Sequence, residues 1–141
     1  MRTRWLALLG IVVAAPSWAK DVPDAGSKAA SAAPIRKLEP AEFKAALEKA
    51  RTSGKFTLLD VREPTETAAG HVQGAELLPY TSGAFAREHG KIPRDRPVLL
   101  YCATGNRAGR AAQLLVAEGW TDVTVLSNGG YEDLRPAEPK R

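Results

Sequence analysis

The sequence has few of the residues that hold disulfides, metal ions or nucleic acids. Its 141 residues include one cysteine, one methionine and two histidines. A single cysteine excludes an internal disulfide, and His71 and His89 have no companion cysteine or acidic spacing that makes a metal site. Basic residues do not cluster with aromatic ones, so nucleic-acid binding is not indicated. With 44% hydrophobic and 26% charged residues, the chain fits one globular domain with a modest core.

Long apolar runs are also lacking, except for one near the beginning. Residues 1–4 are basic, residues 5–15 are apolar, and Ser17 and Ala19 are small residues suited to a cleavage site. This pattern predicts a secretory signal peptide over residues 1–19 and hence a periplasmic or secreted protein. The alternative is an uncleaved anchor, but the apolar run rises only about 16 Å as a helix, roughly half of the bilayer core. We therefore expect no stable membrane insertion after cleavage.

The segments on either side of the predicted domain are poor in large apolar side chains. Residues 20–37 are rich in Ala, Ser, Pro and Lys, and residues 136–141 include Pro136 and Pro139. Neither segment has enough apolar surface to offset the entropy of ordering. We predict a flexible linker over 20–37, a domain over 38–135 and a disordered tail over 136–141.

Helical and strand patterns alternate along this domain. The predicted strands, which are short apolar runs, are 56–61, 74–78, 98–101 and 123–126. The predicted helices, which have helical spacing or Pro and Gly boundaries, are 40–51, 64–69, 82–89 and 107–118. Such alternation requires crossover connections. The expected class is α/β, with a mainly parallel sheet of four or five strands and helices on both faces.

The single cysteine stands where such folds bind ligands. Cys102 directly follows the predicted strand at 98–101, at the carboxyl edge of the sheet, and precedes the predicted helix at 107–118. Peptide N–H groups of a tight loop and the positive end of that helix stabilise a thiolate, the nucleophilic form. We therefore predict a reachable catalytic thiolate at Cys102. The alternative is a small hydrophobe buried at a strand end.

Each position of the loop after the cysteine has an expected role in binding a substrate. Gly105 is expected to take a positive φ, so that the loop curls around the sulfur. Ala103 and Thr104 leave room and backbone donors. Asn106 either shapes the loop or caps the following helix. Arg107 has two open roles, because it either holds an anionic donor or ties the loop to a carboxylate.

Several motifs, in this order and spacing, resemble the rhodanese homology domain. They are Leu59-Asp60-Val61-Arg62-Glu63-Pro64 with Glu66, Gly70-His71-Val72 with Gly74-Ala75, Cys102-x-x-Gly105-Asn106-Arg107, and Asn128-Gly129-Gly130-Tyr131. With the export signal, the chain is similar to small periplasmic thiosulfate sulfurtransferases. The resemblance implies one rhodanese-like domain whose Cys102 carries a persulfide from thiosulfate or a related donor to cyanide or a thiol, including a protein thiol. It implies no metal and no organic cofactor.

Three alternatives are weighed against that function. A Cys-His-Asp hydrolase needs an imidazole at the thiol, but Asp60 is expected to cap its loop or pair with Arg62, and His71 to make a structural hydrogen bond. Related phosphatases use Cys-x5-Arg, whereas this Cys-x4-Arg ring is smaller and suits a sulfur atom. A non-catalytic or redox-sensing binding module on the same fold is the third.

The loop departs from the family pattern in ways that concern the donor. Some relatives that use thiosulfate have basic side chains inside the loop, where this chain has Ala103 and Thr104. Ala108 stands where serine is frequent. The choice between thiosulfate and another sulfane donor therefore stays open.

Overall fold

The sheet is parallel throughout, as the alternation of helices and strands requires. The structure is a computed structural model that describes residues 34–136. Within these residues the strands are β1 (Arg36–Leu38), β2 (Thr57–Asp60), β3 (Glu76–Leu77), β4 (Val98–Tyr101) and β5 (Val123–Leu126). Their order is β1-β5-β4-β2-β3, and each neighbouring pair is parallel. The predicted fold class is confirmed, and β4, which leads to Cys102, is the central strand.

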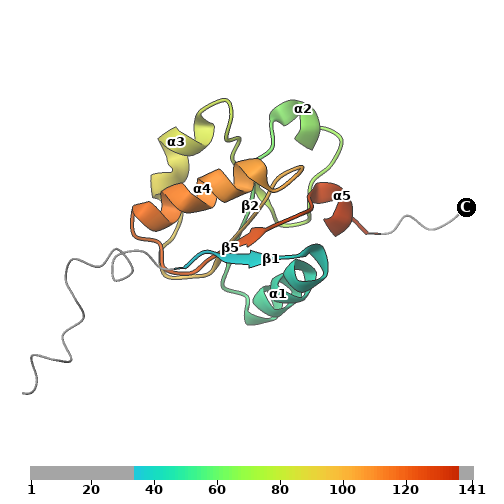
Figure 1. The fold of residues 1–141 in the computed structure, drawn as a ribbon, viewed down its shortest axis with the longest axis horizontal. Helices are drawn as coiled ribbons and strands as arrows, with labels where there is room; N and C mark the ends of the chain where they lie inside the picture. The colour runs from blue at the N-terminus through green and yellow to red at the C-terminus, as the bar shows by residue number, and fades with distance from the viewer. Residues whose placement is uncertain (1–33, 137–141) are drawn as a thin grey trace, which may run out of the picture.

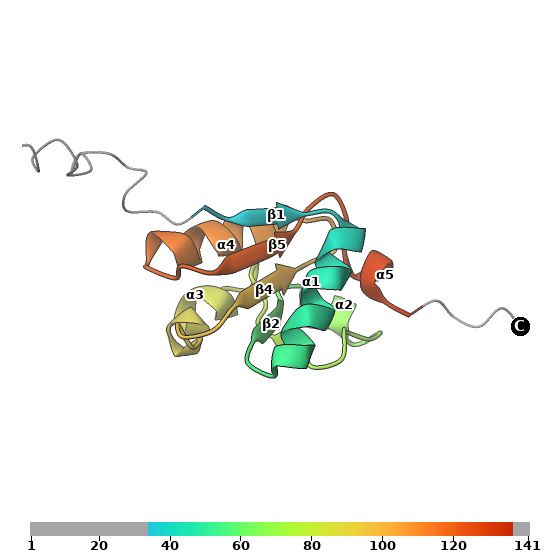
Figure 2. The ribbon, with the colours of Figure 1, turned by 90° about the horizontal axis from the view of Figure 1, so that it is seen from below.

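Helices cover both faces of the sheet (Figure 1 and Figure 2). They are α1 (Pro40–Ser53), α2 (Pro64–Thr67), α3 (Ala84–Glu88), α4 (Asn106–Ala117) and α5 (Tyr131–Leu134), with a 3-10 turn, η3 (His89–Lys91), after α3. Helices α3 and α4 lie on one face, and α1 and α5 lie on the other. The layers are therefore helix, sheet, helix.

The core consists of two apolar clusters, one on each face of the sheet. Successive residues of a strand point to opposite faces. In β4, Leu100 packs in the cluster that contains Leu115 of α4, whereas Leu99 packs in the cluster that contains Phe43 of α1. Burial on both faces explains why β4 is apolar throughout and why β5 has one polar residue, the buried Thr124.

Two short elements differ from the sequence prediction. The sequence predicts a linker through residue 37, but Arg36–Leu38 form the edge strand β1, with Lys37 opposite Val125 of β5. An edge strand is held by backbone pairing and needs little burial. The charged residues of β1 therefore lack the apolar pattern by which a buried strand is recognised in a sequence. Tyr131–Leu134 form α5, which is not among the predicted helices, because a single turn is too short to show helical periodicity.

Three predicted segments lie wholly or mostly outside the described residues. They are the signal peptide at 1–19, the linker at 20–37 up to residue 33, and the tail at 136–141 after its first residue. Between residues 34 and 136, none of the helices combines the length and hydropathy of a membrane span. The same residues contain no cluster of His, Cys, Asp and Glu side chains suited to a metal ion.

Candidate active site

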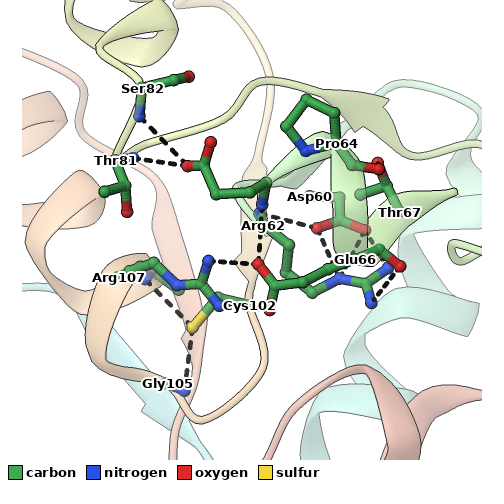
Figure 3. A network of polar contacts seen from close by, with 12 residues as sticks. Asp60, Arg62, Pro64, Glu66, Thr67, Thr81, Ser82, Cys102, Gly105 and Arg107 are labelled. Atoms are coloured by element: carbon green, nitrogen blue, oxygen red, sulfur yellow. Dashed lines mark hydrogen bonds and ion pairs between the residues drawn. The ribbon is translucent and has the colours of Figure 1, made fainter.

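The sulfur of Cys102 lies at the carboxyl end of β4 and faces peptide N–H groups (Figure 3). Sγ accepts hydrogen bonds from the N–H of Gly105 at 3.0 Å and of Ala108 at 3.5 Å. These donors belong to the loop and the first turn of α4, where the unpaired N–H groups and the helix dipole present positive charge. The predicted cradle of peptide N–H groups around the sulfur is therefore present.

Cys102 is more buried than the sequence predicts. Its exposed fraction is 0%, and it packs in the α4-side cluster with Leu100 and Ala108. Residues 100 and 102 are two positions apart, so the cysteine continues the face on which Leu100 points into the core. The expectation of a directly reachable thiol is therefore wrong for this conformation. Ala103 and Thr104, which follow, are exposed.

Gly105, and not Asn106, both turns the loop and caps helix α4. Gly105 has φ +92°, and a Cβ added to it would lie 3.2 Å from the carbonyl oxygen of Leu126. The predicted positive φ is confirmed, and close packing against the end of β5 adds a second reason for glycine. Asn106 is the exposed first residue of α4 and Gly105 is its N-cap, so the alternative in which Asn106 caps the helix is wrong.

Arg107 takes the second of its two predicted roles. Its guanidinium donates to both carboxylate oxygens of Glu66, with N–O distances of 2.6 and 2.8 Å (Figure 3). These hydrogen bonds lower the pKa of Glu66 to about 2, so the carboxylate stays ionised near neutral pH. The pair ties the start of α4 to α2. Because Glu66 compensates the charge of Arg107, this arginine is not free to bind an anionic sulfur donor.

The segment that carries Glu66 is fastened to a second loop. Glu66 Oε2 also accepts the N–H of Glu63 at 2.9 Å, and Glu63 Oε1 accepts the N–H groups of Thr81 at 2.9 Å and Ser82 at 3.2 Å. One side of the site thus contains two carboxylates and one guanidinium. The Glu63 and Glu66 roles are not predicted, although both residues belong to the motif that carries the family resemblance.

A buried ion pair anchors the same segment to the sheet. Asp60 is 0% exposed and accepts hydrogen bonds from Nε and Nη2 of Arg62, at 3.0 and 2.8 Å. Tyr101 donates its hydroxyl to Asp60 at 2.7 Å, and Arg62 donates to the carbonyl of Gly70 at 2.7 Å. The guanidinium also lies over the Tyr131 ring, 4.1 Å from its centre. The predicted pairing of Asp60 with Arg62 is confirmed.

Both histidines make structural contacts, which is the outcome expected for His71. His71 Nδ1 lies 3.0 Å from the carbonyl oxygen of Val72, and His89 Nε2 lies 2.5 Å from Glu118 Oε2. In the part of the chain that the structure describes, the hydrogen-bond donors to the sulfur are both peptide groups. The arrangement required by a Cys-His-Asp hydrolase is not formed.

The glycines after β5 bring the backbone up to the Cys102 loop. Tyr131 N donates to the Cys102 carbonyl at 3.0 Å. A Cβ on Gly130 would lie 2.7 Å from that carbonyl oxygen and would overlap the carbonyl of Ala103. Glycine at position 130 therefore allows this close approach of the two backbone segments. Trp120 packs in the core, with an exposed fraction of 1%.

The rhodanese-like domain family matches residues 39–136, which is most of the chain. The chain belongs to the rhodanese-like domain family. This family includes sulfurtransferases, and its match covers every element from α1 to α5.

Two curated proteins and one solved structure are similar to this chain. The chain is 38% identical over 95 residues to YqhL of Bacillus subtilis, which covers 67% of this chain and 69% of that protein. It is 35% identical over 101 residues to MoeZ of Mycobacterium tuberculosis, named a probable adenylyltransferase/sulfurtransferase, but spans only 25% of it. The crystal structure of a rhodanese-related protein from Thermoplasma volcanium matches with a TM-score of 0.57 at 28% identity, covering 71% of this chain and 90% of that one.

Removing the charge of Arg62 is expected to destabilise this rhodanese-like domain severely. In Arg62→Met, Asp60 stays buried without its counter-charge, which costs about 3–5 kcal/mol in the free energy of unfolding. Urea unfolding followed by tryptophan fluorescence measures this loss. The double variant Asp60→Asn/Arg62→Met should recover part of the stability. A single variant within about 1 kcal/mol of the wild type contradicts the role of the pair.

The Glu66–Arg107 pair is expected to give stability with a defined pH dependence. Because the pKa of Glu66 is lowered, its contribution is present above the ordinary pKa near 4.5 and is lost as the pH falls toward 2. Both side chains are partly exposed, so Glu66→Gln should cost only about 1 kcal/mol at pH 6. Unfolding titrations from pH 6 to 2.5 should show this gap closing. Glu48→Gln, at an exposed pair with Arg51, is the control; a gap independent of pH contradicts the pair's role.

Adding one methyl group at Gly130 is expected to displace the Cys102 loop. Gly130→Ala puts a Cβ against the carbonyls of residues 102 and 103, which should cost about 1–3 kcal/mol and speed alkylation of Cys102 by iodoacetamide. Gly109→Ala is the matched control, because a Cβ there meets nothing within 4 Å and alanine favours a helix. Equal alkylation rates in the wild type and Gly130→Ala contradict the close approach.

Proposed function

We propose that the protein is a sulfurtransferase that carries a sulfane sulfur on Cys102 as a persulfide. One observation carries this proposal: Sγ receives hydrogen bonds from the N–H groups of Gly105 and Ala108. Donors of this kind hold a thiolate ready without an imidazole base. Membership of a family that includes sulfurtransferases supports the same chemistry.

In the first half of the reaction, Cys102 accepts sulfur. Its thiolate attacks the outer sulfur of a sulfane donor, a new S–S bond forms, and the donor's own S–S bond breaks. With thiosulfate, sulfite leaves with the electron pair of that bond. The persulfide anion now carries its negative charge beside the Gly105 and Ala108 N–H groups, which stabilise it as they stabilised the thiolate.

In the second half, an acceptor removes the sulfur. Cyanide or a thiolate attacks the outer sulfur, the Cys102 S–S bond breaks, and its electron pair returns to Sγ. The products are thiocyanate or an acceptor persulfide, together with the original Cys102 thiolate. No external oxidant or reductant enters the cycle.

Loop movement has to precede each transfer, because Cys102 is 0% exposed. The exposed residues Ala103 and Thr104 are small, so their displacement breaks little packing. In the open loop, the backbone N–H groups of residues 103–106 are the donors available to an anionic substrate. Closure over the persulfide excludes water and oxidants.

The location of this reaction is part of the proposal. The charged, apolar and small-residue segments of residues 1–19 favour export, so we place the mature protein in the periplasm or outside the cell. A free thiol in such a compartment has to be shielded or in use. Burial of Cys102 between transfers agrees with this placement.

The test is the capture of the persulfide on Cys102. Incubating the purified protein with thiosulfate should add about 32 Da to the peptide that contains Cys102, and cyanide should remove it as thiocyanate. Cys102→Ser should do neither while its thermal melt stays within a few degrees of the wild type.

The opposite result would favour a binding module. If neither thiosulfate nor an alkyl persulfide loads Cys102, sulfur transfer is excluded, and the 0% exposure of the thiol is then that of a small core residue. A non-catalytic or redox-sensing role would account for the fold in that case.

A further inference from the structure

A groove borders the Cys102 loop on the side of β5 and α4. Its volume is about 330 Å³, which is within the range of sites for small molecules. The residues that line it include Lys37, Gly105, Asn106, Arg110 and Gln113. Gly105 and Asn106 belong to the loop itself, and the N–H of Gly105 donates to Sγ. The groove and the proposed reaction centre therefore share one segment of backbone.

The charge of this groove differs from that of the opposite side of the site. Lys37 of β1 and Arg110 of α4 line the groove, and no carboxylate is among its lining residues. Neither cation forms an ion pair with any of residues 34–136. By contrast, Arg107 is neutralised by Glu66. Unneutralised positive charge next to the loop is thus concentrated in the groove, where it attracts anions.

We propose that the groove binds the carboxylates of an acidic, peptide-sized thiol that takes the sulfur from Cys102; this inference rests on the proposed function. Three extended residues span about 10 Å, so such a thiol can place carboxylates near Lys37 and Arg110 while its sulfur lies at the open loop. Its thiolate attacks the outer sulfur of the Cys102 persulfide. The Cys102 S–S bond breaks, its electron pair returns to Sγ, and the acceptor leaves as a persulfide.

The carboxylates around Arg107 favour this side for the acceptor. On the α2 side, the charges of Arg107 and Glu66 compensate each other, and Glu63 adds a further carboxylate, so no free cation there attracts an anion. The polar groups of Asn106 and Gln113 add hydrogen-bond donors within the groove. An acidic thiol is therefore drawn to the β5 side, and a neutral thiol of the same size gains nothing from it.

The experiment compares two acceptors that differ only in charge. The persulfide is first loaded on the full chain, and the peptides N-acetyl-Glu-Cys-Glu-amide and N-acetyl-Gln-Cys-Gln-amide then remove it. We expect the acidic peptide to react with the higher kcat/KM. In Lys37→Ala/Arg110→Ala this preference should fall roughly three- to tenfold, the effect of losing two exposed charge contacts. Salt at 0.5 M should reduce the preference in the wild type.

The control removes the same amount of charge elsewhere. Lys44→Ala/Lys91→Ala also takes away two exposed cations, but neither residue lines the groove. It should keep the wild-type preference. An equal fall in both double variants, or no preference in the wild type, overturns the groove as an acceptor site.

The failures of the two proposals are distinguishable. If Cys102 never acquires the extra sulfur, the proposed function fails before any acceptor is added. If Cys102 is loaded and both peptides remove the sulfur equally well in every variant, sulfur transfer stands and the groove assignment is wrong.

Discussion

The buried carboxylate of Asp60 is the constraint around which the site is arranged. A charge with no exposure must be fully compensated, and Arg62 and Tyr101 supply that compensation. Arg62 then reaches the Gly70 carbonyl and the Tyr131 ring, so one ion pair connects the ends of β2 and β4 with the segments that follow α2 and β5. Such a pair adds little net stability compared with apolar residues, but its geometry specifies where these segments lie.

Held in this way, the segment after β2 controls the electrostatics of the Cys102 loop. Glu66 accepts hydrogen bonds from Nη1 and Nη2 of Arg107, and the arginine becomes part of the scaffold. The hydrogen bonds to the sulfur come from peptide N–H groups. In the proposed sulfur transfer, these neutral, rigid groups would stabilise a thiolate and a persulfide alike. Selection among anionic partners would then depend on the surroundings of the loop, which include the proposed acceptor groove.

The packing of Cys102 shields its thiol from solvent behind a few loop residues. Its side chain continues the buried face of β4, and Gly130 brings a second backbone against the loop from behind. The side chains of Ala103 and Thr104 in the loop are small and exposed. The thiol is thus shielded in this conformation, and the proposed transfer would need the movement of a few loop residues rather than of a domain.

The fold class, the position of Cys102 and the turn at Gly105 can be predicted from the sequence alone. Uninterrupted apolar runs such as Val98–Tyr101, and the inward-facing alanines of α4, carry the parallel α/β class, because a strand buried on both faces has no polar side to show. The position of the lone cysteine between strand and helix is equally local, and so is the positive φ of Gly105. The short elements β1 and α5 are not predicted from the sequence. Strand β1 is stabilised by pairing with β5, which lies far along the chain, and α5 is a single turn.

Other properties depend on contacts between residues far apart in the chain. The sequence alone leaves two roles open for Arg107. Its contact with Glu66, 41 residues earlier in the chain, selects the role of an ion-pair partner. The burial of Cys102, the pairing of Arg107 with Glu66 and the placement of Lys37 and Arg110 along one groove all arise where separate segments meet at the edge of the sheet. Local patterns specify what each segment can form; the energies of burial and charge pairing, which act between segments, decide which of its side chains remain available for chemistry.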